Sequence, residues 1–453
     1  MNYSQAIAFL HGLQMFGARP GLERVQKLAA ALGDPQKKLR FIHVAGTNGK
    51  GSVCAMLESI YRHAGLRVGL FTSPHLVAFG ERMQVNRLPI FEADIARLVA
   101  QVERGSVIRS TPQAKEASES LKALDEVKRC GSQTRAPMGR LEAGLTFFEF
   151  VTAMALPYFA EQRCDLVIWE TGLGGRLDAT NIVTPLASVI TNIQFDHEKW
   201  LGETLAQIAG EKAGIIKPGV PVITATDAPE ALAVIQETAQ RLNSPLTVVT
   251  PAEARAGLMA TLQLPLLGEH QKLNAAVALA TVAALQKILP VSEAALRAGL
   301  EQVRWAGRLQ VIEQPGQTLL LDGAHNVAGV ESLCAALAQH FPGRRPALVM
   351  GVLADKDWKR IAERLAPLCK KIFTVPVASE RTVSAVKLAE TFRLAGQSAE
   401  ACASLAEALP RVGHEPFVVI AGSLYLIGEA MELLGLLNAA GGERALNEWG
   451  AMR

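Results

Sequence analysis

The sequence predicts an α/β protein made of two doubly wound domains, each built on a mostly parallel sheet. Short apolar runs alternate with amphipathic helical segments along almost the whole chain, which is the pattern of βαβ units. These runs form two series, and each is long enough to supply its own sheet. The predicted strands are residues 41–45, 68–72, 166–170, 188–191 and 220–224, followed by residues 318–322, 347–351, 371–375 and 416–421.

The boundary between the two domains is expected between Pro290 and Gly307. A helix predicted over residues 292–302 ends there, so residues 1–300 form the first domain and residues 301–453 the second. Residues 245–267 have a more β-like pattern, which predicts a few extra strands. Residues 106–140 are rich in Lys, Glu, Ser, Ala and Gln and contain no aromatic residue, which is typical of a flexible surface insertion.

The composition argues against several classes of protein. The chain of 453 residues has 49% hydrophobic residues, 20% charged residues and a net charge of +3, which is too little charge to indicate nucleic acid or an anionic membrane as a partner. No apolar run is long enough to span a bilayer, and no secretion signal is expected. The six cysteines lack C-x-x-C spacing, which favours reduced thiols in a cytoplasm and argues against a zinc site.

A glycine-rich run, Gly46-Thr47-Asn48-Gly49-Lys50-Gly51-Ser52, lies between the first predicted strand and a helical pattern over residues 53–63. This arrangement predicts a phosphate-binding loop, because backbone amides and the helix N-terminus then face the anion. Lys50 is placed to reach the terminal phosphates. Gly51 separates Lys50 from Ser52, so the spacing supports a phosphate role better than direct metal contact by Ser52. The alternative is a glycine turn that only joins a strand to a helix.

Polar side chains follow three further predicted strands. Ser73 follows residues 68–72, Glu170 ends residues 166–170, and His197 comes shortly after residues 188–191. Open α/β sheets bind ligands at the carboxyl ends of their strands. A hydroxyl, a carboxylate and an imidazole near a phosphate loop therefore predict a magnesium site. Taken singly, Glu170 could instead cap a helix, and His197 could be a hydrogen-bonded loop histidine.

Lys212 lies near the end of a predicted helix among apolar neighbours. A lysine in this position ordinarily neutralises the helix C-terminus. If Lys212 is buried, its amine loses the proton more easily. A neutral amine can react with carbon dioxide to give a carbamate, which is an anionic metal ligand.

The second half of the chain contains Asp322-Gly323-Ala324-His325-Asn326 directly after a predicted strand, with Arg308 before that strand. These side chains could bind a nucleotide or a second substrate across a cleft. The alternative for Asp322 is a helix N-cap. The run Gly172-Leu173-Gly174-Gly175 lacks G-x-G-x-x-G spacing, which disfavours a dehydrogenase.

With these motifs in place, the chain resembles the folylpolyglutamate synthases, often bifunctional as dihydrofolate synthases, of the ATP-dependent Mur ligase superfamily. The matching runs keep the family's order and span nearly the whole chain. They include His43 to Ser52, Thr72-Ser73-Pro74-His75, Glu81-Arg82, Leu145 to Phe150, Glu170 to Asn181, Asp196-His197, Glu211-Lys212-Ala213-Gly214-Ile215, His270-Gln271 with Asn274, Asp322 to Asn326, Gly351 to Asp357 and Gly422-Ser423-Leu424-Tyr425.

The resemblance implies a P-loop ATPase-like central domain, a smaller Rossmann-like C-terminal domain and a role for each matching residue. It implies catalytic roles for Lys50, His197, Lys212 and His325. The ATP-binding residues would be Thr47, Asn48, Gly49, Lys50, Gly51, Ser52, Asn274, Arg308 and Asp322, and the metal ligands Ser73, Glu170, His197 and a carbamylated Lys212. The folate-binding residues would be Arg82, Thr146, Phe147, Phe148, Leu177, Asp178 and Ala179, and the glutamate-binding residues His325, Ser379 and Arg381.

The implied reaction activates a carboxylate as an acyl phosphate, which the amine of L-glutamate then attacks. ATP and two Mg²⁺ ions would be required, and K⁺ or a similar monovalent cation could also bind. The substrates would be L-glutamate, reduced folates and 7,8-dihydropteroate, and the protein would be a cytoplasmic monomer without nucleic-acid or membrane partners. The alternatives are a folylpolyglutamate synthase without dihydrofolate synthase activity, a Mur ligase acting on muramyl nucleotides, and a nucleotide switch that forms no amide.

Overall fold

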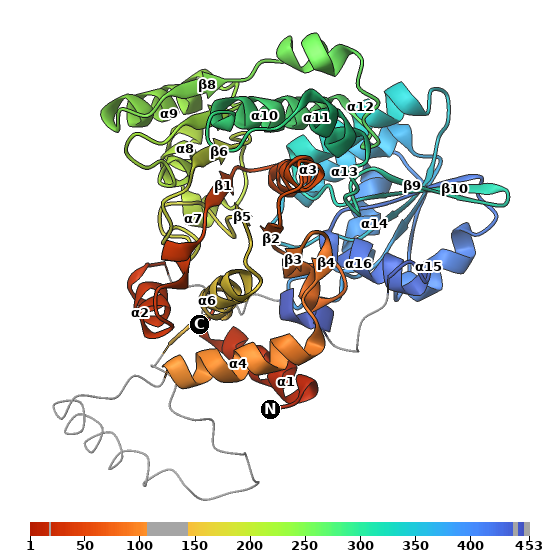
Figure 1. Cartoon of the computed structure of the whole chain (residues 1–453). Helices are drawn as coiled ribbons and strands as arrows, with labels where there is room; N and C mark the ends of the chain where they lie inside the picture. Colours follow the sequence, from red (N-terminus) through yellow and green to blue (C-terminus); the bar gives the residue numbers. More distant parts are fainter. Residues whose placement is uncertain (18–19, 107–143, 438–442, 448–453) are drawn as a thin grey trace, which may run out of the picture.

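The computed structural model describes residues 1–17, 20–106, 144–437 and 443–447. The insertion expected over residues 106–140 lies outside the described residues, apart from Ser106. Two sheets organise the rest, one of eight strands and one of six (Figure 1). The prediction of an α/β fold with two doubly wound, mostly parallel sheets is therefore confirmed.

The first sheet has the strand order β4-β3-β2-β5-β1-β6-β7-β8. Its pairs are parallel except that β3 is antiparallel to both β2 and β4. The strands are β1 (Phe41–Ala45), β2 (Val68–Phe71), β3 (Met83–Val85), β4 (Leu88–Pro89), β5 (Leu166–Glu170), β6 (Ala187–Ile190), β7 (Val222–Thr224) and β8 (Leu246–Val248). The central strand β1 lies between β5 and β6, so the loop that follows β1 opens at the middle of the sheet edge.

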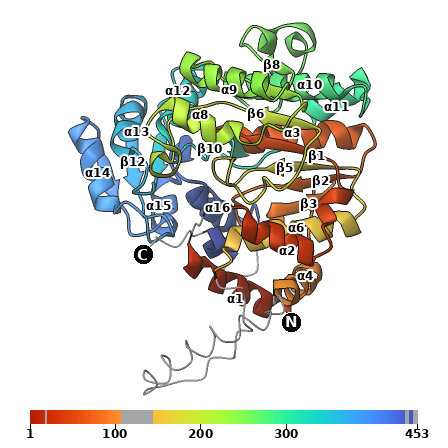
Figure 2. The same cartoon turned by 90° about the vertical axis from the view of Figure 1, so that its left-hand side faces the viewer.

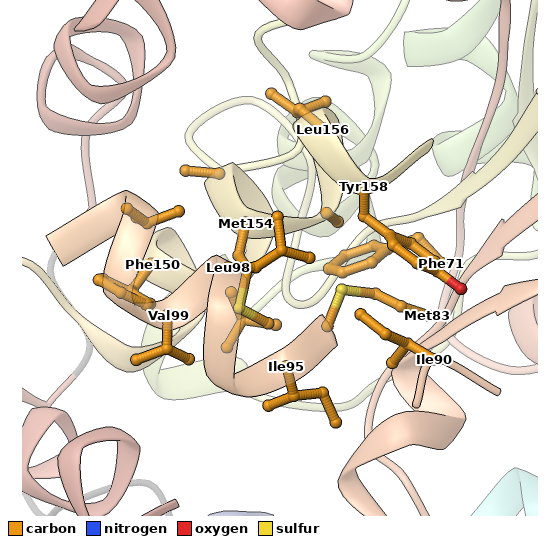
Figure 3. Packing of buried hydrophobic residues seen from close by; sticks show 14 of the residues in the cluster. Phe71, Met83, Ile90, Ile95, Leu98, Val99, Phe150, Met154, Leu156 and Tyr158 are labelled. Atoms are coloured by element: carbon orange, nitrogen blue, oxygen red, sulfur yellow. The ribbon is translucent and has the colours of Figure 1, made fainter. Parts of the chain in front are cut away.

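Alternate residues of β1 face opposite sides of this sheet. Phe41 packs on one face with α1 (Tyr3–Leu13), α2 (Glu23–Ala31), α4 (Glu92–Ser106) and α6 (Phe147–Glu161). Ile42 and Val44 pack on the other face with α3 (Lys50–His63), α10 (Glu269–Leu285) and α11 (Glu293–Glu301). The two helical layers lie on opposite sides of the strands in Figure 2. Figure 3 shows the first cluster, where Phe150 and Met154 of α6 meet Leu98 and Val99 of α4.

The remaining helices of the first half cover the β6–β7 end of the sheet or lie beside the loops at its carboxyl edge. Helices α8 (Leu205–Ala213) and α9 (Pro229–Arg241) pack against Ile190 and Val222, and α7 (Glu198–Leu201) precedes them. No helix in the described part of the chain is both long and apolar enough to cross a membrane.

The second sheet has the strand order β13-β12-β11-β14-β10-β9 and is parallel except for β9. Helices cover both of its faces, three packing around Leu320 and two around Leu321. The strands are β9 (Gln310–Gln314), β10 (Gln317–Asp322), β11 (Ala347–Met350), β12 (Lys371–Thr374), β13 (Ala399–Ala401) and β14 (Phe417–Ala421). The helices are α12 (Val327–His340), α13 (Trp358–Leu365) and α14 (Ala385–Leu394) on one face, and α15 (Leu405–Val412) and α16 (Leu424–Leu433) on the other.

The expectation of a few extra strands over residues 245–267 was wrong. This stretch contains the single strand β8 and two 3₁₀ turns, Glu253–Arg255 and Gly257–Ala260. Proline at 251 and 265 removes a ladder donor, and Gly257 has a positive φ of 55°, so the chain turns instead of pairing. Leu262, Leu264 and Leu266 belong to the core cluster on the face covered by α3, α10 and α11, which explains the apolar pattern.

The last described segment, Glu443–Asn447, returns from the second sheet to the first. Leu446 is 1% exposed and belongs to the core cluster that contains Phe79 and Phe150. The chain therefore crosses between the two halves a second time, after α16.

Candidate active site

Residues from both halves of the chain line one cavity of about 1950 Å³. Its walls include the loops after β1, β2, β5 and β6 and the loop after β10 of the second sheet. All the predicted site residues line this cavity except Ser379. Residues that are far apart in the sequence thus meet where the sequence predicted a composite site.

The glycine loop forms the turn between β1 and α3. Gly46 and Gly49 have φ angles of 144° and 84°, and a Cβ on Gly46 would lie 1.8 Å from Thr191 Oγ1, so this backbone requires glycine. Helix α3 begins at Lys50. The Nζ of Lys50 donates to the carbonyls of Gly46 and Thr47 at 3.0 and 3.2 Å. The loop therefore presents a helix N-terminus and an ammonium group to an anion.

Glu170 and Lys212 line the cavity together with this loop, and each is 4% exposed. Glu170 Oε2 accepts the backbone N–H of Ser73 at 3.0 Å. Burial raises the pKa of Glu170 to about 7, against the opposing charge of Lys50. Lys212 Nζ donates to the Gly46 carbonyl at 2.9 Å, and burial together with the charge of Lys50 lowers the pKa of Lys212 to about 7. A large fraction of Lys212 is therefore neutral near pH 7, as carbamate formation requires.

His197 precedes α7 with a left-handed φ of 53°. Burial, followed by the charge of Lys356, lowers the pKa of His197 to about 3, so its imidazole is neutral. The neighbouring Asp196 accepts hydrogen bonds from Lys356 Nζ at 2.6 Å and from Asn326 Nδ2 at 3.1 Å. Burial would raise the pKa of Asp196, but the neighbouring His325 imidazole and the charge of Lys356 hold this pKa well below its usual range.

The residues predicted to bind metal fit a magnesium ion. Glu170 and His197 offer one carboxylate and one neutral imidazole, and Ser73 offers a hydroxyl. Mg²⁺ keeps few protein ligands and completes its shell with phosphate and water. Within the described ranges there is no group of three His, Cys, Asp or Glu side chains that could hold a metal, so a site of the closed zinc type is not found there.

Asp322, the last residue of β10, accepts hydrogen bonds from the backbone before β9 and after β10. Its Oδ2 accepts the N–H of Leu309 at 2.8 Å, and its Oδ1 accepts the N–H of Ala324 at 3.0 Å. The N-cap of α12 is Asn326, so the helix-cap alternative for Asp322 was wrong. Burial raises the pKa of Asp322, although the nearby Arg308 opposes this. Asp322 and Arg308 thus lie in the same wall of the cavity.

Asn274 of α10 packs directly against the glycine loop. A Cβ on Gly49 would lie 2.5 Å from Asn274 Oδ1. The Nδ2 of Asn274 donates to Gln271 Oε1 at 3.1 Å. Asn274, predicted to bind the nucleotide, is therefore held beside the loop predicted to bind the phosphates.

The aromatic side of the cavity is fixed by the start of α6. Thr146 and Glu149 form a capping box, with hydrogen bonds of 2.8 and 3.2 Å, and this places Phe147 and Phe148 in the first helical turn. The Arg82 guanidinium lies 5.3 Å from the centre of the Phe147 ring. This wall of the cavity therefore presents two phenyl rings and the positive charge of Arg82.

The 173–180 loop completes this side. Asp178 Oδ2 accepts the N–H of Leu173 at 2.8 Å, and its Oδ1 accepts the N–H of Thr180 at 3.0 Å. Leu177 is 47% exposed and Ala179 is 5% exposed, both lining the cavity.

Of the three residues expected to bind glutamate, His325 and Arg381 line the cavity. The Nδ1 of His325 lies 2.7 Å from the Gly323 carbonyl, which turns Nε2 towards Asp196 at 3.8 Å. Arg381 Nη2 donates to the Tyr425 hydroxyl at 3.3 Å. Ser379 does not line the cavity, and its Oγ accepts the Arg381 backbone N–H at 3.1 Å.

Sequence reasoning did not assign Lys356 or Asn326 to the site. Asn326 exchanges hydrogen bonds with Asn48 of the glycine loop at 3.1 and 3.3 Å. Both residues lie in runs that were singled out, and Lys356 lies between two aspartates in the loop that follows the predicted strand over residues 347–351. A charged residue in the loop after a strand is a signal for a site residue, but the sequence does not show that Lys356 pairs with Asp196.

Comparison with known proteins gives consistent results. Residues 307–424 match the family model described as "Mur ligase, glutamate ligase domain". The chain is 36% identical to a dihydrofolate synthase/folylpolyglutamate synthase of Bacillus subtilis, over 95% of this chain and 99% of that protein. It is 34% identical to a folylpolyglutamate synthase of Lacticaseibacillus casei, over 96% and 99%. The structure of E. coli FolC in complex with DHPP and ADP matches with a TM-score of 0.79 and 30% identity, over 96% of this chain and 98% of that chain.

Proposed function

Because the chain belongs to the family of dihydrofolate and folylpolyglutamate synthases, we propose that it attaches L-glutamate both to 7,8-dihydropteroate and to reduced folates. Members of this family are ATP-dependent, amide-forming ligases of the Mur ligase type. The observation that carries the proposal is the single cavity lined by the glycine loop, the Phe147–Phe148 wall and the Asp322–His325 loop. The proposed nucleotide, folate and glutamate sites would therefore lie in one cavity.

ATP phosphates would lie on the glycine loop, where Lys50 would exchange its two carbonyl contacts for phosphate oxygens. Asn274, Arg308 and Asp322 would hold the rest of the nucleotide beside the loop. The substrate carboxylate attacks the γ-phosphorus, so an acyl phosphate and ADP form. Lys50 would stabilise the charge on the transferring group.

The amine of L-glutamate then attacks the acyl carbon, and phosphate leaves as the amide bond forms. His325 and Arg381 would position the amino acid on the side of the second sheet. Closure of the two halves around the cavity would exclude water, which would otherwise hydrolyse the acyl phosphate. Mg²⁺ held by Ser73, Glu170 and His197 would neutralise phosphate charge.

Lys212 would provide a further anionic group as a carbamate. Its neutral amine would attack carbon dioxide, forming an N–C bond and releasing one proton. The support is the burial of Lys212 and its lowered pKa of about 7. A ¹³C NMR spectrum of the enzyme under ¹³CO₂ should show one carbamate signal, and Lys212→Ala should lack it. A wild-type spectrum without the signal would contradict the modification.

Several finer assignments belong to the same proposal. They are two Mg²⁺ ions, a monovalent cation such as K⁺, a monomer that does not bind nucleic acid, and domains over residues 1–300 and 301–453. The described cysteines are unpaired thiols, which supports a reducing compartment such as the cytoplasm.

Incorporation of labelled L-glutamate tests the function directly. The enzyme is given ATP with either 7,8-dihydropteroate or tetrahydrofolate, and the labelled products are separated. Product from both acceptors is expected. Product from tetrahydrofolate alone would restrict the enzyme to polyglutamylation, and product from neither would refute the proposal.

A further inference from the structure

The C-terminal segment Glu443–Asn447 contacts the folate side of the cavity through Arg82. Arg82 lines the cavity and is 3% exposed. Its Nη2 donates to Asn447 Oδ1 at 2.6 Å, and its Nε donates to His75 Nδ1 at 2.8 Å. Burial lowers the pKa of Arg82 to about 10, so the guanidinium remains charged at neutral pH.

Both of these partners are neutral. His75 Nδ1 accepts the hydrogen bond from Arg82, and its Nε2 lies 3.0 Å from the Glu443 carbonyl, so this imidazole is the neutral form protonated on Nε2; Asn447 is an amide. No carboxylate among the described residues lies within ion-pairing distance of Arg82. A buried cation held only by neutral acceptors keeps its charge for an anionic ligand. The carboxylate-bearing substrate expected on this wall has that character.

The segment itself is firmly anchored to the first half of the chain. Glu443 Oε2 accepts the N–H of Phe79 at 2.6 Å, and the Glu443 carbonyl accepts from His75 Nε2 at 3.0 Å. Asn447 Nδ2 donates to the His75 carbonyl at 2.9 Å. These hydrogen bonds hold Asn447 in a fixed position next to Arg82.

Asn447 also reaches the second half of the chain. Its carbonyl accepts the hydroxyl of Tyr425, and that hydroxyl is the acceptor for Arg381. One residue therefore links the cation on the folate side to the arginine expected on the glutamate side.

We propose that Asn447 is a positioning residue, which holds the Arg82 guanidinium in place for the anionic folate substrate. This inference rests on the proposed function, because it takes the substrate of the Phe147 wall to be a folate. It assigns to the C-terminal segment a role in substrate affinity in addition to its packing through Leu446.

Equilibrium binding of 7,8-dihydropteroate, measured by fluorescence without ATP, tests the role apart from turnover. Asn447→Ala should weaken binding about 10-fold or more, the range for a lost hydrogen bond to a charged group. The KM for the folate should rise by a similar factor, while the KM for ATP stays unchanged. Tyr3→Phe is the matched control, because it removes the Tyr3–Glu443 hydrogen bond in the same segment without touching Arg82.

A double-mutant cycle separates positioning from packing. Arg82→Ala should weaken binding, and adding Asn447→Ala to it should weaken binding no further. If Asn447→Ala does not fold, the nearly isosteric Asn447→Asp replaces it and should also weaken binding, because its carboxylate neutralises Arg82. Additive effects, or unchanged binding in the Asn447 variant that folds, would overturn the proposal. Unchanged binding in Arg82→Ala would overturn it too, whereas normal binding without amide product would refute only the proposed function.

Discussion

The Nζ of Lys356 lies 2.6 Å from Oδ1 of Asp196, and the two side chains are only 6% and 9% exposed. Asp196 follows β6 of the first sheet, and Lys356 follows β11 of the second. The same ammonium lies 3.4 Å from Nε2 of His197. A buried ion pair thus joins the two halves beside a predicted metal ligand.

Lys356→Met should destabilise the nucleotide-free protein by about 3–5 kcal/mol, because it leaves the Asp196 carboxylate buried and unpaired. Adding Asp196→Asn should restore much of this loss. Urea denaturation of the two single variants and the double variant measures both effects. Arg411→Met is the control, since Arg411 pairs with Glu407 at the surface and should cost less than about 1 kcal/mol. A double variant as unstable as the sum of the singles would contradict the coupling.

Lys50→Ala should reduce amide formation at least about 100-fold, because the transferring phosphoryl group loses its main protein cation. Within the described residues, the Lys50 ammonium donates only to loop carbonyls, so the melting temperature should change little. Steady-state release of ADP and phosphate measures the loss. Lys37→Ala, at a side chain that is 74% exposed, provides a surface-lysine control. Turnover near the wild-type rate would refute the assignment of the glycine loop.

Sequence reasoning was most successful where a local pattern determines the structure. Residues 41–45 and 166–170 were predicted with the bounds of β1 and β5, because each is an apolar run ended by a loop signal. The edge strands β9 and β13 were missed, since their half-exposed residues lack such a run. The partner of Arg82 is 365 residues away in the chain. No spacing rule could pair Asn447 with Arg82, because tertiary folding alone brings them together.

His197→Ala should raise the Mg²⁺ concentration for half-maximal activity by about tenfold or more, the cost expected when a metal site loses a supporting group. The imidazole is suited to binding a cation, because burial and Lys356 lower its pKa to about 3 and leave it neutral. Mn²⁺ binding followed by electron paramagnetic resonance gives a second readout that does not need turnover. His414→Ala, at a side chain 75% exposed, is the control. An unchanged magnesium titration would argue against His197 as a ligand.

Acid should destabilise the protein partly through His43, which is 0% exposed in β1. Its Nε2 lies 2.9 Å from Thr180 Oγ1, and burial lowers its pKa from 6.5 to about 3. The unfolded chain therefore takes up a proton below pH 6.5, whereas the folded chain does so only near pH 3. The stability that the neutral imidazole contributes is thus complete above pH 6.5 and is lost progressively as the pH falls towards 3.

The expected loss from this one residue is about 1.4 kcal/mol per pH unit, or about 2 kcal/mol at pH 5. His43→Gln should be less stable than wild type at pH 7.5, because it disturbs a buried site in the central strand. The difference should shrink by about 2 kcal/mol at pH 5, since the variant has no proton to take up at this position. Urea denaturation at both pH values measures the change, with the exposed His414→Gln as the control. A gap between wild type and His43→Gln that is the same at both pH values would show that residue 43 does not contribute to the acid sensitivity.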